Sequence, residues 1–249
     1  NYDHIPAIEY YRNATTKVVK LDIKKVGKRV GYITGAGDKV PQALEQMGYE
    51  VVLLGEKDIN ITNLQQLDAI VTGVRAHNTN SWMSNVYDVL MQYVKDGGVL
   101  LVQYNTNNSI GPVKAKISPY PFTITRNRIS DETAAVNFLL PDHPVLNYPN
   151  KITQKDFDGW IQERSIYNAE NIDSNFQRIL SMKDPGEKEQ DGSLIVTNLG
   201  KGRFIYTGLA FFRELPAGIP GAYRLFANLI TSPKSLPKEG TLKQVKIKK

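Results

Sequence analysis

The sequence contains no cysteine and only three histidines among its 249 residues. The lack of cysteine excludes a disulfide framework, a thiolate nucleophile and any metal site built on cysteine ligands. The histidines, His4, His77 and His143, are scattered without an HxH or HxxxH spacing. Because zinc sites depend on such clustered ligands, we expect no metal site, and no motif indicates a cofactor.

Long hydrophobic runs and a dispersed positive charge are also lacking. No apolar run approaches the roughly 18 residues of a membrane span, and no charged-then-apolar signal pattern opens the sequence. Since it begins at Asn1 without a methionine, we expect a fragment or processed product that has lost a targeting segment. The net charge is +6, but residues 234–249 hold six lysines and one glutamate. The rest of the chain is therefore nearly neutral, which favours a solvated basic tail and argues against nucleic-acid binding.

The first half of the chain alternates strand and helix patterns. A hydrophobic content of 41% is enough for one large domain with a buried core. The pattern predicts strands at 29–34, 50–54, 68–73 and 99–104, and helices at 40–47 and 82–94, the second with Ser81 as its N-cap. Strands separated by helices of this length are typical of a parallel sheet that is covered on both faces.

The second half is richer in loops. Residues 105–192 contain many Pro, Asn and Asp residues between short apolar segments, which predicts a loop-rich β insertion. A hairpin is expected from 193–197 and 203–207, and a closing helix at 218–231 with Pro220 in its first turn. We therefore expect an N-terminal extension or linker strand at 1–27, an α/β domain at 28–232 and a basic tail at 233–249.

Polar clusters follow the predicted strands and mark a candidate binding site. Because the carboxyl ends of parallel strands meet at one edge of a sheet, clusters that follow successive strands should converge there. A fourth cluster, DFDGWIQER, lies in the second half and contains side chains suited to sugar binding. The predicted binding residues are Asp38, Arg75, His77, Asn78, Gln103, Tyr104, Asn105, Asp156, Trp160, Gln162, Glu163 and Arg164.

Each of these signals also has a structural interpretation. The GAGD turn could cradle an anion, but it fits a tight turn with Asp38 as a helix cap better. Trp160 suits stacking on a sugar ring, although a core position is the more common one for such an aromatic residue. Asp156 and Asp158 could act as acid and base or bind a cation, although no third ligand is apparent. The charged segment RNRISDE, 126–132, indicates an ion-pair network that holds a loop.

Five longer segments resemble a known family. They are GYITGAGD, IVTGVRAHNT, YVKDGGVLLVQYNT, PNKITQKDFDGWIQERSIY and LAFFRELPAGIPGAYRLFANLI. Over residues 3–232 the chain resembles the C-terminal region of exported PIG-L/LmbE-type deacetylases of Bacteroidetes. The resemblance implies a three-layer α/β sandwich with a mainly parallel sheet, the class I glutamine amidotransferase-like (flavodoxin-like) fold. It also implies an attached N-terminal deacetylase domain and a periplasmic or extracellular location.

The residues that would carry catalysis in such proteins are missing from this chain. The AHPDDE-like motif of the deacetylases is absent, and QYNTN stands where class I amidotransferases have their cysteine. A Thr106 nucleophile would need a base, for which His77 is the one reasonable partner. We expect a non-catalytic accessory domain of a carbohydrate N-deacetylase that binds glycan, oligomerises or shapes the enzyme. The alternatives are a hydrolase acting through Asp156/Asp158 or His77, and a purely structural docking module.

Overall fold

The computed structural model describes residue 4 and residues 9–15, 18–107, 112–113 and 115–237. Most of the predicted basic tail, residues 238–249, lies outside the described residues, and the division at 27/28 and 232/233 stays a prediction. Among the described residues, no helix combines the length and apolar character that crossing a membrane requires.

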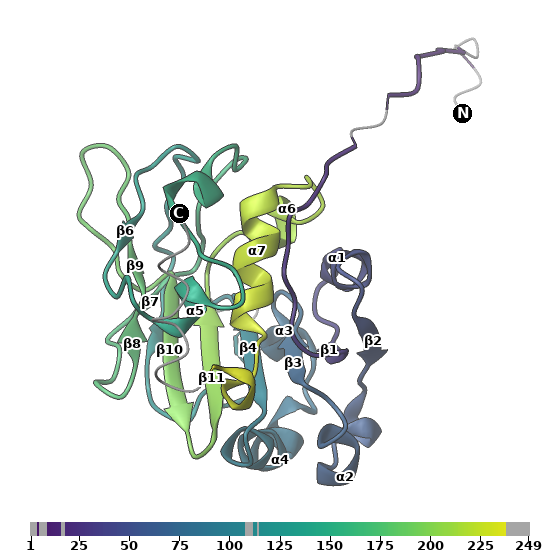
Figure 1. Cartoon of the computed structure of the whole chain (residues 1–249), viewed down its shortest axis with the longest axis vertical. Coiled ribbons are helices and arrows are strands. Elements are labelled where there is room, and N and C mark those ends of the chain that lie inside the picture. Colours follow the sequence, from purple (N-terminus) through teal and green to yellow (C-terminus); the bar gives the residue numbers. More distant parts are fainter. Residues whose placement is uncertain (1–3, 5–8, 16–17, 108–111, 114, 238–249) are drawn as a thin grey trace, which may run out of the picture.

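A seven-stranded sheet forms the centre of the molecule (Figure 1). Its strand order is β2-β1-β3-β4-β11-β10-β8. The first five strands run parallel, whereas β10 is antiparallel to both of its neighbours. The strands are β1 (Arg29–Ile33), β2 (Glu50–Leu53), β3 (Ala69–Thr72), β4 (Val99–Gln103), β8 (Gln177–Arg178), β10 (Leu194–Leu199) and β11 (Gly202–Thr207). The predicted parallel sheet and the predicted hairpin are confirmed.

Helices cover both faces of this sheet. One face packs against α1 (Val40–Gln46), α5 (Pro144–Asn147), α6 (Phe211–Glu214) and α7 (Pro220–Leu229). The other face packs against α2 (Ile61–Leu64) and α4 (Met83–Lys95), while the short α3 (Ala76–Thr79) follows β3. Three short 3₁₀ turns, η1 (Glu56–Asp58), η2 (Gln154–Phe157) and η3 (Pro233–Ser235), complete the helical elements of the described chain.

The alternation of side chains along each strand produces these two cores. In β4, Val99 and Leu101 join the cluster under α7, and Leu100 and Val102 join the cluster under α4. All four side chains are at most 1% exposed. Successive strand residues point to opposite faces, so a strand covered on both sides has to be apolar at every position.

One predicted helix start is wrong. Helix α4 begins at Met83 with Trp82 in the cap position, and Trp82 forms no side-chain cap. Ser81 lies in the preceding turn, where its carbonyl oxygen accepts a hydrogen bond from the Ser84 hydroxyl at 3.2 Å. The 29–34, 50–54, 68–73 and 99–104 strands and the helix begun by Pro220 fall within a residue or two of their predicted positions.

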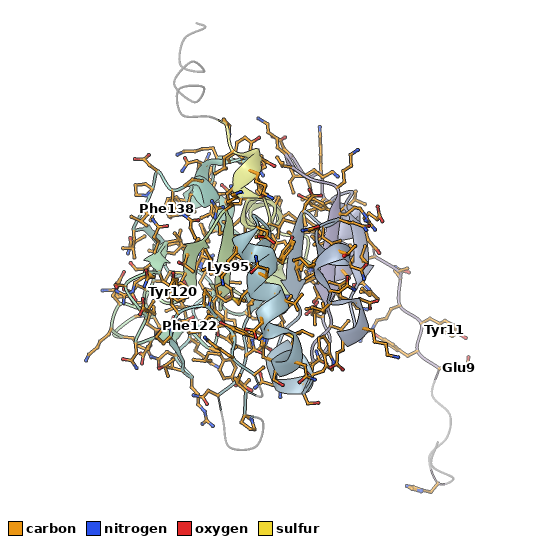
Figure 2. All side chains as sticks on the ribbon, turned by 90° about the horizontal axis from the view of Figure 1, so that it is seen from below. Glu9, Tyr11, Lys95, Tyr120, Phe122 and Phe138 are labelled. Carbon is orange, nitrogen blue, oxygen red and sulfur yellow. The ribbon has the colours of Figure 1, made fainter. Side chains whose placement is uncertain are left out.

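The loop-rich insertion carries two small ribbons beside the main sheet. Strand β5 (Thr123–Ile124) pairs with β7 (Ala169–Glu170), and β6 (Asn137–Phe138) pairs with β9 (Leu180–Ser181). The rings of Tyr120 and Phe122 (Figure 2), which lead into β5, contact Phe176, and Phe122 also contacts Tyr206 of β11. The insertion thus covers the edge of the sheet beyond β10 and β8 (Figure 1).

The N-terminal segment runs along α7 before it reaches β1. The Arg224 guanidinium of α7 donates to the carbonyl of Asp22 at 2.9 Å, and Asn150 both donates to and accepts from the backbone of Lys24. Further toward the N-terminus, Glu9 and Tyr11 project away from the body of the molecule (Figures 1 and 2).

Candidate functional site

The loops after β1 and β3 are locked together by Asp38. One oxygen of its carboxylate accepts hydrogen bonds from the Tyr32 hydroxyl at 2.5 Å and the Val40 amide at 3.0 Å, and the other accepts from the Val74 amide at 3.0 Å. Gly35 packs so closely that a Cβ there would lie 2.1 Å from the Val74 carbonyl oxygen. The sheet order reverses at this point, but the crevice where ligands commonly bind is filled by these contacts.

The side-chain amides of Asn78 in α3 and Asn105 after β4 hold the two segments together. The Asn78 side chain donates to the Thr106 carbonyl at 2.8 Å and accepts from the Thr106 amide at 2.9 Å. The Asn105 side chain accepts from the His77 amide at 2.9 Å and donates to the carbonyl of Gln103 at 3.1 Å. The polar clusters that follow β3 and β4 therefore come together as predicted. The side chains of Asn78 and Asn105, however, form their hydrogen bonds with backbone groups of these segments.

Gln103 and His77 lie beneath the surface of this edge. Gln103 is 1% exposed and donates to the carbonyl of Thr72 at 3.2 Å. Burial lowers the pKa of His77 to about 4, so its imidazole is neutral at physiological pH. The Nδ1 atom of the imidazole has no hydrogen-bond partner within the described chain. The structure therefore does not place His77 as a base for a Thr106 nucleophile.

The second-half cluster is largely structural. Asp156 forms an ion pair with Arg224, Nε to Oδ1, at 2.7 Å and accepts from the amide of Thr153. Trp160 is 3% exposed, packs against Phe157 and donates through Nε1 to the Asp156 carbonyl at 3.0 Å. This burial corrects the expectation that Trp160 stacks on a sugar, because its ring faces lie in the core.

The other residues of DFDGWIQER separate. Arg164 is 5% exposed and donates to the carbonyls of Ala134 and Phe157. Gln162 is exposed. Asp158 is exposed too, whereas Asp156 is buried, so the two carboxylates do not face one shared pocket. Glu163 forms an ion pair with Arg213, with Nε 3.0 Å from Oε1. Of this cluster, Glu163 alone joins the side chains at the ends of β3 and β4.

An aromatic–arginine cluster lies at this edge. The Tyr104 ring stacks on Tyr167, with ring centroids 5.4 Å apart and planes 10° from parallel, and contacts Phe212 at 5.3 Å. The Arg213 guanidinium lies 4.9 Å from the centroid of Phe212. All three rings are half-buried. We define the cluster as Arg75, Tyr104, Glu163, Tyr167, Phe212 and Arg213.

The charges of the cluster act on Tyr104. Burial raises the pKa of its hydroxyl, while the nearby Arg75 and Arg213 oppose that rise. Arg75 has a φ of 60°, a left-handed conformation that costs roughly 1–3 kcal/mol in a non-glycine residue. Its amide donates to the Tyr104 carbonyl at 2.8 Å, and its buried Nε has no partner in the described chain.

Sequence reasoning missed half of this cluster. Arg213 and Phe212 lie in FFRELPAG, a segment that carried the family resemblance but was assigned no role in the site. Tyr167 is the last residue of PNKITQKDFDGWIQERSIY, which also carried the resemblance without giving Tyr167 a role in the site. Its position depends on the Tyr206 hydroxyl, which donates to the Tyr167 carbonyl at 2.7 Å. A hydrogen bond between residues 39 apart in sequence leaves no local pattern.

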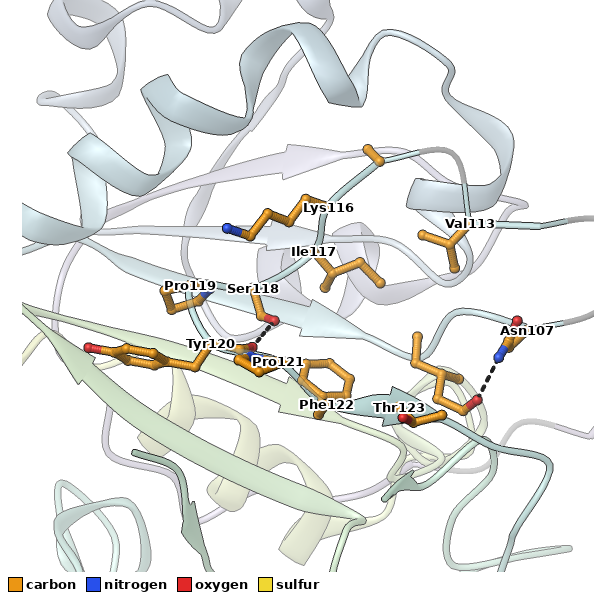
Figure 3. Close-up of a pocket in the computed structure, with 12 residues that line it drawn as sticks. Asn107, Val113, Lys116, Ile117, Ser118, Pro119, Tyr120, Pro121, Phe122 and Thr123 are labelled. Atoms are coloured by element: carbon orange, nitrogen blue, oxygen red, sulfur yellow. Dashed lines mark hydrogen bonds between the residues drawn. The ribbon is translucent and has the colours of Figure 1, made fainter. Parts of the chain in front are cut away.

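A cavity of about 540 Å³ lies beside this edge but contains none of the predicted site residues. Figure 3 shows that its walls come mostly from residues 113 and 115–124, with Phe122, Ile117 and Pro119 among the apolar groups. Asn107 donates to the Ile124 carbonyl at 3.1 Å at one end. The cavity is therefore formed mainly by the insertion itself, and we assign it no ligand.

The sheet order and the two covered faces define the class of fold. It is a three-layer α/β sandwich of the class I glutamine amidotransferase-like, flavodoxin-like type. At the end of β4, where the resemblance to class I amidotransferases implies a cysteine, the chain has Tyr104 and the tethered Asn105.

Comparisons with solved structures agree with this class. The chain is similar to the cytoplasmic protein STM3548 from Salmonella typhimurium, with a TM-score of 0.53 and 15% identity over 82% of this chain and 98% of that one. It is also similar to a β-galactosidase from Bacillus circulans sp. alkalophilus, with a TM-score of 0.50 and 10% identity over 84% of this chain and 31% of that one.

A ThuA-like protein from Bacteroides uniformis aligns with a TM-score of 0.48 and 12% identity over 88% of this chain and 99% of that one. No protein-family model matches the sequence, and no curated protein matches it. At these identities the likenesses concern the fold alone.

Proposed function

We propose that this chain is a non-catalytic accessory domain that binds carbohydrate for an attached enzyme. The observation that carries the proposal is the aromatic–arginine cluster at the carboxyl ends of the strands. Half-buried aromatic rings offer broad, rigid faces for the apolar side of a sugar, and the Glu163–Arg213 pair offers an acceptor and donors for its hydroxyl groups.

Two features support a binding role over a catalytic one. Asp38, Asn78 and Asn105 are engaged by neighbouring backbone groups and are not directed at a substrate. His77 is neutral and buried, and Asp156 is held by Arg224. A nucleophile needs a base within hydrogen-bond reach, and neither His77 nor Asp156 is arranged to supply one.

The attached enzyme that we propose is an exported PIG-L/LmbE-type carbohydrate N-deacetylase, on the strength of the sequence resemblance. Its N-terminal deacetylase domain would be the partner of this domain, and the location would be periplasmic or extracellular. In the similar β-galactosidase the aligned region makes up 31% of the chain, so in that protein a unit of this fold is carried by a longer enzyme.

Titration calorimetry with N-acetylglucosamine oligomers, peptidoglycan fragments and simple neutral sugars tests the proposal. We expect Tyr104→Ala to weaken binding about tenfold, because a lost stacking contact is worth up to about 1.5 kcal/mol. Tyr104→Phe, which keeps the stack, should bind nearly as well as the parent chain. Tyr10→Ala, at a tyrosine that is 74% exposed in the N-terminal segment, is the matched control.

The competing functions give different results. A hydrolase acting through Asp156 would turn over a substrate and lose that turnover in Asp156→Asn at unchanged folding. Equal affinity in the parent chain and Tyr104→Ala would overturn the placement of the binding site at the cluster. No binding of any saccharide would overturn the proposal in favour of a docking module.

A further inference from the structure

We propose that the cavity beside Tyr167 binds the anionic group of an acidic saccharide. The inference rests on the proposed carbohydrate function and adds the chemical class of the ligand. The cavity has a volume of about 440 Å³ and is lined by Arg126, Arg128, Ile166 and Tyr167. This volume lies within the range of small-molecule sites, roughly 300–1,000 Å³.

Both arginines are exposed and belong to a segment that the backbone holds at its two ends. The Thr125 amide donates to the Asn168 carbonyl at 3.1 Å, and the Ile129 amide donates to the Ser165 carbonyl at 2.9 Å. Arg126 lies in a bend between these two contacts, and both arginines contribute to the wall of the cavity.

Both guanidinium groups lack a protein partner among the described residues. The sequence predicts an ion-pair network for the segment 126–132, and the structure corrects this prediction. Neither Arg126 nor Arg128 forms a salt bridge or a side-chain hydrogen bond within the described chain. Arg128 acts electrostatically on Asp184, but that carboxylate accepts hydrogen bonds from the Ser130 hydroxyl and the Asp131 amide.

The acidic group next to this pair is also engaged elsewhere. Asn127, between the two arginines, donates its side-chain N–H to the Glu170 carboxylate. The cavity therefore has two guanidinium groups that are not paired with a carboxylate of the described chain. Each of them presents a planar set of N–H donors and a positive charge. Such planar sets match the two oxygens of a carboxylate or sulfate better than they match a neutral hydroxyl.

Tyr167 belongs to both the cavity and the aromatic–arginine cluster. Its ring stacks on Tyr104, and the residue also lines the cavity. Tyr167 has a φ of 54°, and its carbonyl is fixed by the buried Tyr206 hydroxyl. A sugar ring held on Tyr104 and Tyr167 would therefore have its acidic substituent, or that of the next sugar, at the two arginines.

Calorimetry with trigalacturonate and its methyl ester tests the role of the charge, since esterification neutralises each carboxylate and leaves the sugar rings unchanged. We expect the parent chain to bind the acid at least about tenfold more tightly than the ester. Arg126→Gln/Arg128→Gln should abolish this preference, and Arg126→Lys/Arg128→Lys should reduce it through loss of the bidentate geometry. Arg12→Gln, in the exposed N-terminal segment, should leave it unchanged.

A sulfated galactose in the same assay distinguishes the source of the charge, because a site for sulfate esters would prefer it to the uronate. Equal binding of acid and ester by the parent chain would overturn the inference while leaving the proposed function intact. A preference that survives in the double glutamine variant would also overturn it. Binding of inorganic sulfate without any saccharide would overturn the saccharide assignment, and Tyr104→Ala would then test the proposed function separately.

Discussion

Replacing Glu214 with glutamine should change how the stability of the protein depends on pH. The Glu214 side chain is fully buried, and its two carboxylate oxygens lie 3.2 and 3.1 Å from the Ile161 amide that donates to them. Burial raises its pKa from 4.5 to about 7, although the Ile161 amide, Arg164 and Arg213 act in the opposite direction.

The sign of the effect follows from proton binding. Between pH 4.5 and 7 the folded protein holds a proton on Glu214 that the unfolded chain has released. The contribution of Glu214 to stability is therefore fully present below pH 4.5 and is lost as the pH rises through 7. At 1.36 kcal/mol for each pKa unit, the loss amounts to about 3 kcal/mol.

Urea unfolding of the parent chain and Glu214→Gln between pH 4.5 and 8 measures this loss. Glutamine retains an acceptor oxygen for the Ile161 amide and does not titrate, so the difference between the two curves isolates Glu214. We expect the variant to gain about 3 kcal/mol relative to the parent across this range. Glu187→Gln, at an exposed turn, is the control. Parallel curves for the parent and Glu214→Gln would refute the reasoning.

Three further predictions concern residues whose roles the structure reassigned. Trp160→Ala should lower the free energy of unfolding by about 3–5 kcal/mol in a denaturant titration, because it opens a cavity in the core, and an unchanged midpoint would contradict that placement. The His77 imidazole should stay neutral down to about pH 4 in an NMR titration, and a midpoint near 6.5 would contradict its burial. The contribution of the neutral, buried imidazole to the stability of the protein should be lost as the pH falls from 6.5 through 4. Asp38→Ala should cost about 2–4 kcal/mol in thermal unfolding, since three donors lose an ionised acceptor, whereas exposed Lys39→Ala should cost under about 0.5 kcal/mol.

The periodicity of the sequence was enough to predict most of the fold. Runs such as VLLV in β4 are apolar at every position, which indicates a strand covered on both faces. Strand and helix signals alternate, and this alternation implies a parallel sheet whose carboxyl ends share one edge. The meeting of the 38, 75–78 and 103–105 clusters follows from that topology.

The tertiary structure alone decided what each polar side chain does there. The sequence predicts that Asn105 and Asn78 bind a ligand, but their side chains bind backbone groups 28 residues away. No local sequence pattern extends over that distance. Trp160 looks the same in sequence whether it lies in a core or on a surface, and packing against Phe157 decides the question. Conversely, Tyr167 and Arg213 belong to the cluster because the insertion and α6 fold back over the strand ends. The sequence by itself determined the edge at which a site would form, while long-range packing decided which side chains remain open to a ligand.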